Sequence, residues 1–338
     1  MNQQQRNVLL GIGIAVAVLV IIILIFILRS SAPKVNQIHS IGSQYQLGPT
    51  NDGLTFIDNN SNLQQYTDSN KSIRFIGSTN MDFQPKISLS ANYVSTITGS
   101  QNSSFQITPI ANYGGNAGFG TTTLAYGYLS WGVDNLITGM IPTNSRPDRS
   151  QPADIQTYYG KLAQRSADNI NQVLKQSPQD WQFQNIVYAD NQRIMLAVTE
   201  PGNVKIKSIS TANWQETSNW QYNSLVESYQ AGQKLILRAE STTPVEIIDT
   251  DSKRYVTNLQ LPARLVYPVG SHQLCVLIQN SDNVELGLYD YKSNRYDKKF
   301  KLPSFIFQPN NIVANTKNIY ISTNSGMFEV QNFLGGVK

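Results

Sequence analysis

Apolar runs of strand length, separated by short polar turns, follow one another along most of the chain. Between residues 265 and 303 three such runs occur, LVYPV, QLCVLIQ and VELGLYDY, with Gly270-Ser271-His272 and Asn280–Asn283 between them. Val, Ile, Leu and Tyr favour strands, whereas Gly, Ser, Asn and Asp favour turns because they adopt or stabilise turn conformations. This stretch therefore predicts a meander of antiparallel strands.

The same pattern recurs at a nearly constant spacing. Aligned on the second and most apolar strand, six units start at Gly53, Tyr93, Arg193, Lys234, Gln273 and Asn318. These starts are 40, 100, 41, 39 and 45 residues apart, so one interval is about two and a half units long. That interval leaves room for a weaker unit, Thr122 to Ile141, and for one insertion. A period of about 40 residues predicts a repeat architecture in which each unit buries its faces against its neighbours.

The insertion, at about residues 146–181, has a different periodicity. Its apolar residues recur at three- and four-residue steps, at Ile155, Tyr159, Leu162, Ile170, Val173 and Leu174. This spacing is typical of an amphipathic helix and predicts one from Asp154 to Gln176. Ser177-Pro178 would end that helix, because the residue before a proline disfavours helical backbone angles.

Two units continue alike after their third strand and carry a family resemblance. Ile248–Ser252 and Tyr289–Ser293 share an apolar residue, Asp, two variable positions and Ser, and their aspartates are 41 residues apart. The hairpins VEIIDTDSKRYVTNL and VELGLYDYKSNRYDKKF are similar to those of WD40-like and other bacterial extracytoplasmic β-propellers. The subfamily is unassigned, because no unit carries the Gly-His and Trp-Asp pairs of true WD40 repeats.

The resemblance covers residues 45 to 333 and implies an all-β fold, a β-propeller of seven blades with six as the alternative, interrupted by the inserted α-helix. Each blade of such a fold is a four-stranded antiparallel sheet. Many propellers close their ring by pairing an N-terminal strand with the last blade. The segments expected to form this seam are Ile38–Leu47 and Met327–Phe333.

An uninterrupted apolar segment from Val8 to Leu28 predicts one transmembrane helix, since 21 helical residues span about 30 Å. A cleaved secretory signal is the alternative, although its apolar region is usually shorter, about 7 to 15 residues. The predicted organisation is a tail at 1–7, the helix at 8–28, a linker at 29–44 and the propeller at 45–338. Gly11 with Ala15, and Gly13 with Ala17, place small residues on one helix face, which would permit a homodimer.

The orientation in the membrane is not decided by the flanking charges, because Arg6 on one side opposes Arg29 and Lys34 on the other. The short tail favours a cytoplasmic N-terminus and a domain outside the cytoplasm. Composition agrees with this, since only 14% of the residues are charged and Asn, Gln, Ser and Thr supply the polar surface. A domain facing the cytoplasm is the alternative.

Charge and cysteine content exclude several function classes. The net charge is +4 and is dispersed, which does not predict a nucleic-acid partner. Cys275 is the only cysteine, so no intrachain disulfide is expected, and its apolar strand predicts a buried, inert thiol.

The sequence predicts no catalytic, cofactor-binding or metal-binding residue. His39 and His272 are the only histidines, too few for a histidine-based metal cluster. The segment Gly114–Gly120 is glycine-rich but lacks the lysine of a phosphate-binding loop. Asp58–Asn62 alternates oxygen-bearing side chains as calcium loops do, yet it lacks their glycine and distal glutamate, which favours a polar hairpin turn.

Aromatic residues are the remaining candidates for ligand contact, because they are enriched at binding hot spots and stack on sugars. The candidates for contact with a partner or a glycan are Tyr158, Tyr159, Trp181, Trp214 and Trp220. Packing between blades is the alternative role for them. The sequence thus predicts a membrane-anchored, extracytoplasmic propeller that binds or scaffolds an envelope or surface protein. The alternatives are a propeller enzyme acting on glycans or peptides, and a scaffold facing the cytoplasm.

Overall fold

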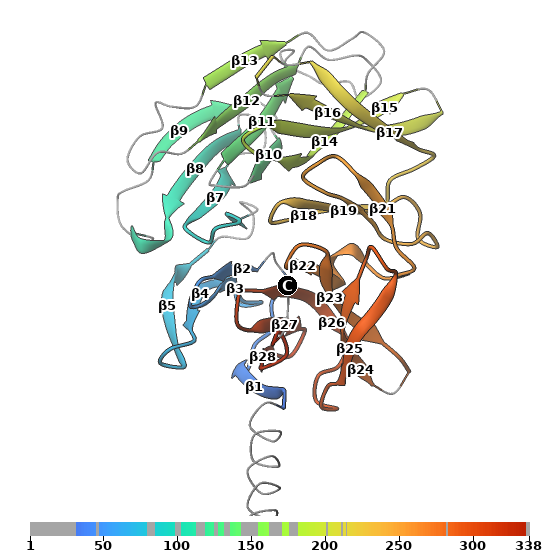
Figure 1. Cartoon of the computed structure of the whole chain (residues 1–338). Helices are drawn as coiled ribbons and strands as arrows, with labels where there is room; N and C mark the ends of the chain where they lie inside the picture. Colours follow the sequence, from blue (N-terminus) through green and yellow to red (C-terminus); the bar gives the residue numbers. More distant parts are fainter. Residues whose placement is uncertain are drawn as a thin grey trace, which may run out of the picture.

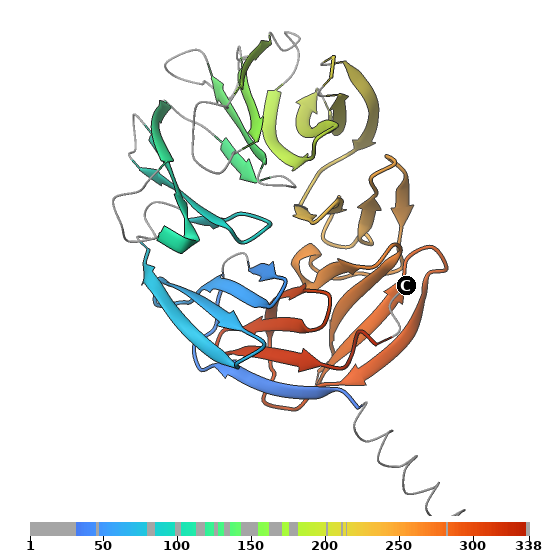
Figure 2. The same ribbon diagram turned by 60° about the vertical axis from the view of Figure 1, so that its left-hand side comes forward.

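The structure, a computed structural model, describes the chain from residue 32 to residue 335 with internal gaps. The described residues are 32–44, 47–79, 85–98, 103–112, 119–124, 128–131, 136–142, 155–161, 171–175, 182–200, 202–210, 212–213, 215–281 and 283–335. They form seven four-stranded antiparallel sheets that surround a common centre (Figures 1 and 2).

The first three sheets follow one another along the chain, each a meander of four strands. The first contains β2 (Gly48–Thr50), β3 (Gly53–Ile57), β4 (Asn62–Thr67) and β5 (Ser72–Ser78). The second contains β6 (Lys86–Ile87), β7 (Tyr93–Thr98), β8 (Ser103–Pro109) and β9 (Phe119–Leu124). The third contains β10 (Tyr128–Trp131), β11 (Leu136–Pro142), β12 (Ile155–Lys161) and β13 (Asn171–Lys175).

The next three sheets have the same order. The fourth contains β14 (Gln182–Ala189), β15 (Arg193–Glu200), β16 (Asn203–Ser210) and β17 (Glu216–Tyr222). The fifth contains β18 (Glu227–Ala231), β19 (Lys234–Arg238), β20 (Glu246–Ile248) and β21 (Arg254–Val256). The sixth contains β22 (Val266–Val269), β23 (Gln273–Gln279), β24 (Val284–Asp290) and β25 (Arg295–Lys301).

The seventh sheet joins the two ends of the chain. It contains β26 (Pro309–Ala314), β27 (Ile319–Thr323) and β28 (Met327–Gln331), and its outermost strand is β1 (Lys34–His39). Lys34 pairs with Gln331 and His39 with Met327. Closure by pairing of an N-terminal strand with Met327–Gln331 is therefore confirmed, but the pairing strand is Lys34–His39, inside the segment predicted as a linker, and not Ile38–Leu47.

The core lies between neighbouring sheets rather than inside any one of them. Buried apolar residues of the sixth and seventh sheets form one cluster, and those of the fifth and sixth form another. Second strands such as β23 are buried along most of their length, because both faces of the sheet are covered. All six predicted second-strand starts lie at, or one residue before, the first residue of such a strand.

The predicted helix from Asp154 to Gln176 is wrong. The structure has β12 and β13 in this segment, and they pair antiparallel with Ile155 opposite Lys175. A four-residue step, as from Ile155 to Tyr159, keeps two side chains on one face of a strand as well as of a helix. The β-branched and aromatic residues of IQTYYGK favour the strand. The weak unit and the insertion together supply the third sheet.

The sheets have two distinct ends. The turn end carries the turns between the first and second strands and between the third and fourth. The loop end carries the turns between the second and third strands and the connections from each sheet to the next. Because Lys34 pairs with Gln331, the last residue of a third strand, β1 begins at the turn end.

The described residues exclude the predicted membrane segment Val8–Leu28, and no helix within them combines the length and apolar character needed to cross a bilayer.

Candidate functional site

An aromatic loop, residues 302–308, connects the sixth sheet to the seventh at the loop end. Phe305 and Phe307 expose 56% and 54% of their surface, whereas Leu302 and Ile306 are buried in the cluster between these sheets. Exposed phenylalanines are costly in water. The loop thus alternates anchoring and exposed apolar side chains.

Several contacts fix the aromatic loop to its scaffold. The Leu302 amide donates to the Val284 carbonyl at 2.9 Å, and the Ile306 amide donates to the Pro303 carbonyl at 3.0 Å. The ring of Phe305 lies 5.6 Å, between centroids, from the ring of buried Phe328 on β28. A partner would therefore meet two apolar side chains on a loop that is already ordered, which lowers the entropy lost on binding.

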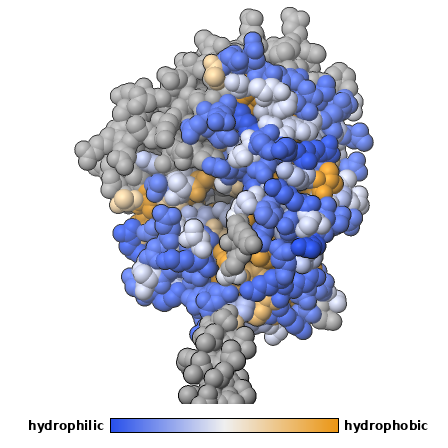
Figure 3. Space-filling model, in the orientation of Figure 1, coloured by the Kyte–Doolittle hydropathy of each residue, from blue (hydrophilic) through white to orange (hydrophobic). Residues whose placement is uncertain are grey.

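The aromatic loop begins directly after Lys301, the last residue of β25, and side-chain amides lie on the strand and turns that follow. On the neighbouring strand and turns, the Asn310 side-chain amide donates to Asn324 Oδ1 at 3.2 Å, and the Asn59 amide donates to the Asn324 carbonyl at 3.3 Å. Within the described part of the chain, the buried Asn310 Oδ1 has no hydrogen-bond partner. Apolar side chains beside amide groups are typical of the centre of a protein-binding surface, and a charged residue such as Lys301 is typical of its rim. The face drawn in Figure 3, by contrast, is mostly hydrophilic.

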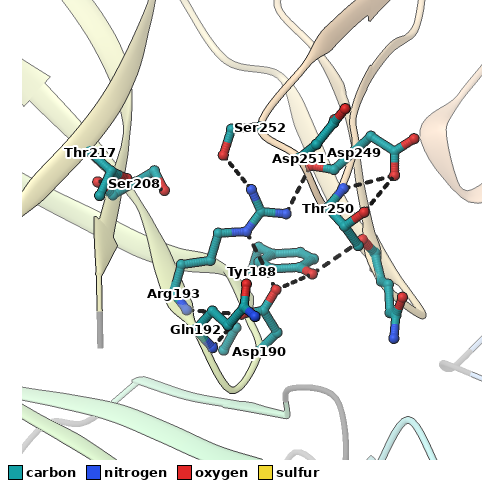
Figure 4. Close-up of polar contacts among 12 residues, drawn as sticks. Tyr188, Asp190, Gln192, Arg193, Ser208, Thr217, Asp249, Thr250, Asp251 and Ser252 are labelled. Carbon is teal, nitrogen blue, oxygen red and sulfur yellow. Dashed lines mark hydrogen bonds and ion pairs between the residues drawn. The ribbon is translucent and has the colours of Figure 1, made fainter. Parts of the chain in front are cut away.

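At the turn end, buried charged side chains join the sheets to one another (Figure 4). Arg193, the first residue of β15, reaches from the fourth sheet to the fifth, where it donates to the Ser252 hydroxyl and, at 2.8 Å, to the Asp249 carbonyl. Its guanidinium lies over the ring of Tyr188 at 5.0 Å and 3.4 Å from Asp190 Oδ2. Only 7% of the Arg193 side chain is exposed.

Lys234, the first residue of β19, repeats this arrangement one sheet further. Its ammonium donates to Asp249 Oδ1 at 3.1 Å, to the Ser271 carbonyl at 3.0 Å and to the Tyr291 hydroxyl oxygen at 2.8 Å. Ser271 and Tyr291 belong to the sixth sheet, so Lys234 joins it to the fifth. We call Arg193 and Lys234 the inter-sheet clamps.

The ionisation of Asp249 and Tyr291, the two partners of Lys234, suits a structural role. Burial raises the pKa of Asp249, but hydrogen bonds from Tyr291, the Thr250 amide and Lys234 outweigh it and hold that pKa below its ordinary value. Burial, followed by the hydrogen bond to Asp249, raises the pKa of Tyr291. The carboxylate therefore stays charged and the phenol neutral at neutral pH. Neither group is suited to transferring a proton there.

The seam between the first and seventh sheets holds a further buried charge. Glu329 on β28 is completely buried and accepts hydrogen bonds from four side chains of these two sheets. The donors are Tyr66 at 3.1 Å, Lys71 at 2.9 Å, Asn318 at 2.7 Å and Gln331 at 2.8 Å. Hydrogen bonds from four side chains offset the cost of removing the carboxylate from water.

The first strands of the fourth, fifth and sixth sheets, β14, β18 and β22, each carry a tyrosine at the same position relative to the second strand. Tyr188 lies opposite Met195, Tyr229 opposite Ile236 and Tyr267 opposite Cys275, and each partner is the third residue of its second strand. Burial is the largest cause that raises the pKa of all three tyrosines. They are neutral packing groups, and their spacings of 41 and 38 residues follow the repeat.

Cys275, His272 and Asp58, which the sequence offered as candidates for chemistry, pack in the core or stabilise turns. Cys275 is fully buried, and burial raises the pKa of its thiol. His272 Nε2 lies 3.3 Å from Asp290 Oδ2, which joins two turns of the sixth sheet. Asp58 Oδ1 accepts from the amides of Asn60 and Asn62, so this segment is a capped hairpin turn. No cluster of three potential metal-ligating residues occurs among the described residues.

The five aromatic candidates from the sequence are not brought together at one place by the described structure. Tyr158 and Tyr159 lie on β12, and Trp220 lies on β17, half-buried against the cluster between the fourth and fifth sheets. Trp181 and Trp214 lie outside the described residues. A role of these five residues in binding stays a prediction.

Sequence reasoning missed the aromatic loop and the clamps. Ser304-Phe305-Ile306-Phe307 has the alternation of a half-buried segment, but its position at the boundary of a unit concealed it. For the clamps a signal existed, because Arg193 and Lys234 both open an apolar second strand at the same repeat position.

Comparison with known proteins supports the fold and leaves the function open. No family model matches the chain, and no curated protein matches it significantly. A chain in a solved structure titled "Crystal Structure of Mitotic Checkpoint Complex" is similar over 88% of this chain and 90% of its own, with 10% identity and a TM-score of 0.52. A streptogramin B lyase structure is similar over 88% of this chain and 97% of its own, with 12% identity and a TM-score of 0.53.

The chain has a β-propeller-like fold. Both likenesses fall at 10–12% identity, and a fold shared at that level does not fix an activity. A checkpoint complex and a lyase are also unrelated in function. A function for this chain therefore has to be inferred from its own surface residues.

Proposed function

We propose that this protein is a membrane-anchored, seven-bladed β-propeller that binds a protein partner outside the cytoplasm through its aromatic loop. The observation that carries this proposal is the exposed pair Phe305 and Phe307 on a loop held by buried Leu302 and Ile306. Propeller-like proteins present ordered loops from a rigid scaffold, and binding residues concentrate on such loops.

Different observations support the number of blades and the membrane anchor. Seven four-stranded sheets among the described residues, the last completed by β1, support seven blades. The apolar segment Val8–Leu28 in the sequence supports the anchor, and only five residues separate it from β1. The short N-terminal tail supports a domain outside the cytoplasm.

The chemistry of the loop defines the partner. Phenylalanines beside asparagine amides favour an uncharged, apolar surface with a few hydrogen-bonding groups, such as an extended segment of an envelope protein. Burial of two phenylalanine side chains is worth several kcal/mol, about 1.5 to 3 each. Each phenylalanine is thus expected to act as a hot spot.

Photocrosslinking in intact cells tests this function. A benzophenone amino acid at Ser304, which lies exposed beside Phe305, should crosslink one protein, and the crosslink should fall at least tenfold in a Phe305→Ser/Phe307→Ser variant. Phe75→Ser is the matched control, because Phe75 is equally exposed, at 59%, but lies on β5 of the first sheet. The proposal fails if both variants lower the crosslink equally, or if neither does.

Accessibility to protease separates the two orientations. In intact cells with a permeable outer layer, added protease should cleave the domain if it lies outside the cytoplasm. Protection that disappears only after cell lysis would instead establish the scaffold facing the cytoplasm.

A further inference from the structure

A serine, a histidine and an aspartate lie in line at the turn end of the sixth sheet. Ser271 Oγ lies 2.6 Å from His272 Nδ1, and His272 Nε2 lies 3.3 Å from Asp290 Oδ2. Ser271 is exposed, and 29% of the His272 side chain and 14% of the Asp290 side chain are exposed. A hydroxyl within reach of a base that is itself oriented by a third group is the arrangement by which hydrolases activate a serine.

Asp290 decides which nitrogen of the imidazole carries the proton. Burial raises the pKa of Asp290, but hydrogen bonds from the Ser293 and Lys292 amides outweigh it. Together with the nearby His272, these bonds hold the pKa below its ordinary value. The carboxylate is therefore charged at neutral pH and favours a proton on Nε2, the nitrogen that faces it. Nδ1 is then left to accept the proton of the Ser271 hydroxyl.

The backbone of the serine and the histidine is held in place by neighbouring groups. The Ser271 carbonyl accepts hydrogen bonds from the Lys234 ammonium at 3.0 Å and from the Tyr291 hydroxyl at 2.8 Å. The His272 carbonyl accepts one from the Tyr291 amide at 3.1 Å. Catalytic groups need such support, because a reacting atom must be kept within a fraction of an ångström of its position.

The fifth sheet shows that the repeat does not need these groups. Gly232-Gln233 stands there 39 residues before Ser271-His272. The equivalent carboxylate, Asp249, is paired with a lysine instead of a histidine. A tie between two turns therefore accounts for the carboxylate of the sixth sheet, but it does not account for the hydroxyl beside the imidazole.

We propose that Ser271, His272 and Asp290 hydrolyse carboxylic esters at the turn end of the sixth sheet. This activity goes beyond the proposed function and is independent of the aromatic loop, which lies at the opposite end. The exposure of Ser271 favours small, soluble esters. Esters are favoured over peptide bonds, because an alcohol leaves more readily than an amine and needs less help from an acid.

The reaction has two steps. In the first, Ser271 Oγ bonds to the ester carbonyl carbon while its proton passes to His272 Nδ1. The bond to the alcohol oxygen then breaks, and that oxygen takes the proton from His272, which leaves an acyl-serine. In the second, water attacks the acyl carbon and gives a proton to Nδ1, the acid departs, and the proton returns to Ser271. The His272 amide, directly after the nucleophile, is the expected donor to the oxyanion.

A fluorophosphonate probe tests the nucleophile on the full chain in detergent. Ser271 Oγ would displace fluoride from phosphorus as its proton passes to His272, and peptide mass spectrometry locates the adduct. Ser304 is the internal control, because it is exposed and has no imidazole at hydrogen-bond distance in the described part of the chain. Ser271 should react about a hundredfold faster than Ser304, since a positioned base contributes about 10²- to 10⁴-fold.

Two conservative variants separate chemistry from the stability of the turns. His272→Gln removes the base, so labelling of Ser271 should fall about a hundredfold and lose the ascending limb of its pH profile. Asp290→Asn keeps an oxygen for the turn amides but presents an N–H to Nε2, which favours the wrong tautomer. It should lower labelling by about tenfold or more. Asp297→Asn removes the same charge from the same end of the sheet and should leave labelling unchanged.

Hydrolysis of p-nitrophenyl acetate tests turnover. The wild-type chain should release nitrophenolate through many cycles, and Ser271→Ala, a change at an exposed side chain, should reduce the rate to background. The proposal is overturned if Ser271 reacts no faster than Ser304, if His272→Gln leaves labelling unchanged, or if Ser271→Ala retains hydrolysis. None of these outcomes affects the crosslink at the aromatic loop, so the two functions stand or fail separately.

Discussion

Lys71 and Glu329 form an ion pair of 2.9 Å across the seam of the ring, although 258 positions separate them in the sequence. The Lys71 side chain is half-exposed, whereas the Glu329 side chain is completely buried. The asymmetry matters, because a solvated lysine tolerates the loss of its partner better than a buried carboxylate does. When the ring closes, the first sheet therefore supplies Lys71 as a partner for the buried carboxylate of Glu329 on the seventh.

Removal of either partner should therefore have unequal effects. Glu329→Ala should lower the free energy of unfolding by roughly 3–5 kcal/mol, since it leaves Tyr66, Asn318 and Gln331 without their acceptor. Lys71→Met should cost about 1 kcal/mol, because the other donors still satisfy Glu329. Urea-induced unfolding of the full chain measures both values. A larger effect for Lys71→Met would contradict this account of the seam.

The strand β1 should stabilise the whole ring. Val35 pairs with Val330 and packs against the cluster between the sixth and seventh sheets. Deletion of Lys34–His39 would expose the edge of β28 and should lower the melting temperature by on the order of 10 °C. Asn36→Ala is the control, since Asn36 is exposed on the same strand, and its melting temperature should stay near the wild-type value. An unchanged melting temperature after the deletion would refute closure by β1.

The repeat could be predicted from the sequence because burial on both faces produces near-continuous apolar strands. RIMLAVT and QLCVLIQ show this pattern, and both are second strands in the structure. The third sheet could not be predicted in the same way. Its strands β12 and β13 have apolar residues at steps that suit a helix as well as a strand, and only pairing with β11 decides between them.

The candidate site was less predictable than the fold. A phenylalanine in the sequence gives no sign of whether its neighbours cover it, and Phe305 and Phe328 differ in this respect although their rings are in contact. Which turns share one end of the ring follows from the pairing of β1 with β28, which the family resemblance predicted but which no local sequence pattern marks.

Cys275 should be unreactive in the folded protein. Burial raises the pKa of its thiol, so the reactive thiolate is scarce at neutral pH, and the side chain is inaccessible as well. Iodoacetamide should add no mass to the native chain and one adduct in urea, as measured by intact mass spectrometry. Rapid labelling of the native chain would contradict the burial of β23.

Asp249 should make the stability of the protein depend on acid pH. Burial raises its pKa, but the hydrogen bonds from Tyr291, Thr250 and Lys234 prevail, so the folded pKa lies below that of the unfolded chain, which is about 3.9. The stabilisation by the charged carboxylate is therefore complete well above that pKa and is lost as the pH falls through the lower folded pKa.

The variant Asp249→Asn should consequently be less stable than the wild type at pH 7, by about 2 kcal/mol, because Lys234 loses a charged acceptor. The difference should shrink below about pH 4, where the unfolded wild-type chain takes up a proton on Asp249, and it should vanish below the folded pKa. Urea midpoints from neutral to acid pH measure this convergence. Asp251→Asn, at an exposed carboxylate two residues away, should change the midpoint little at any pH. A difference for Asp249→Asn that stays constant with pH would show that packing of the side chain, and not its charge, stabilises the junction of the fifth and sixth sheets.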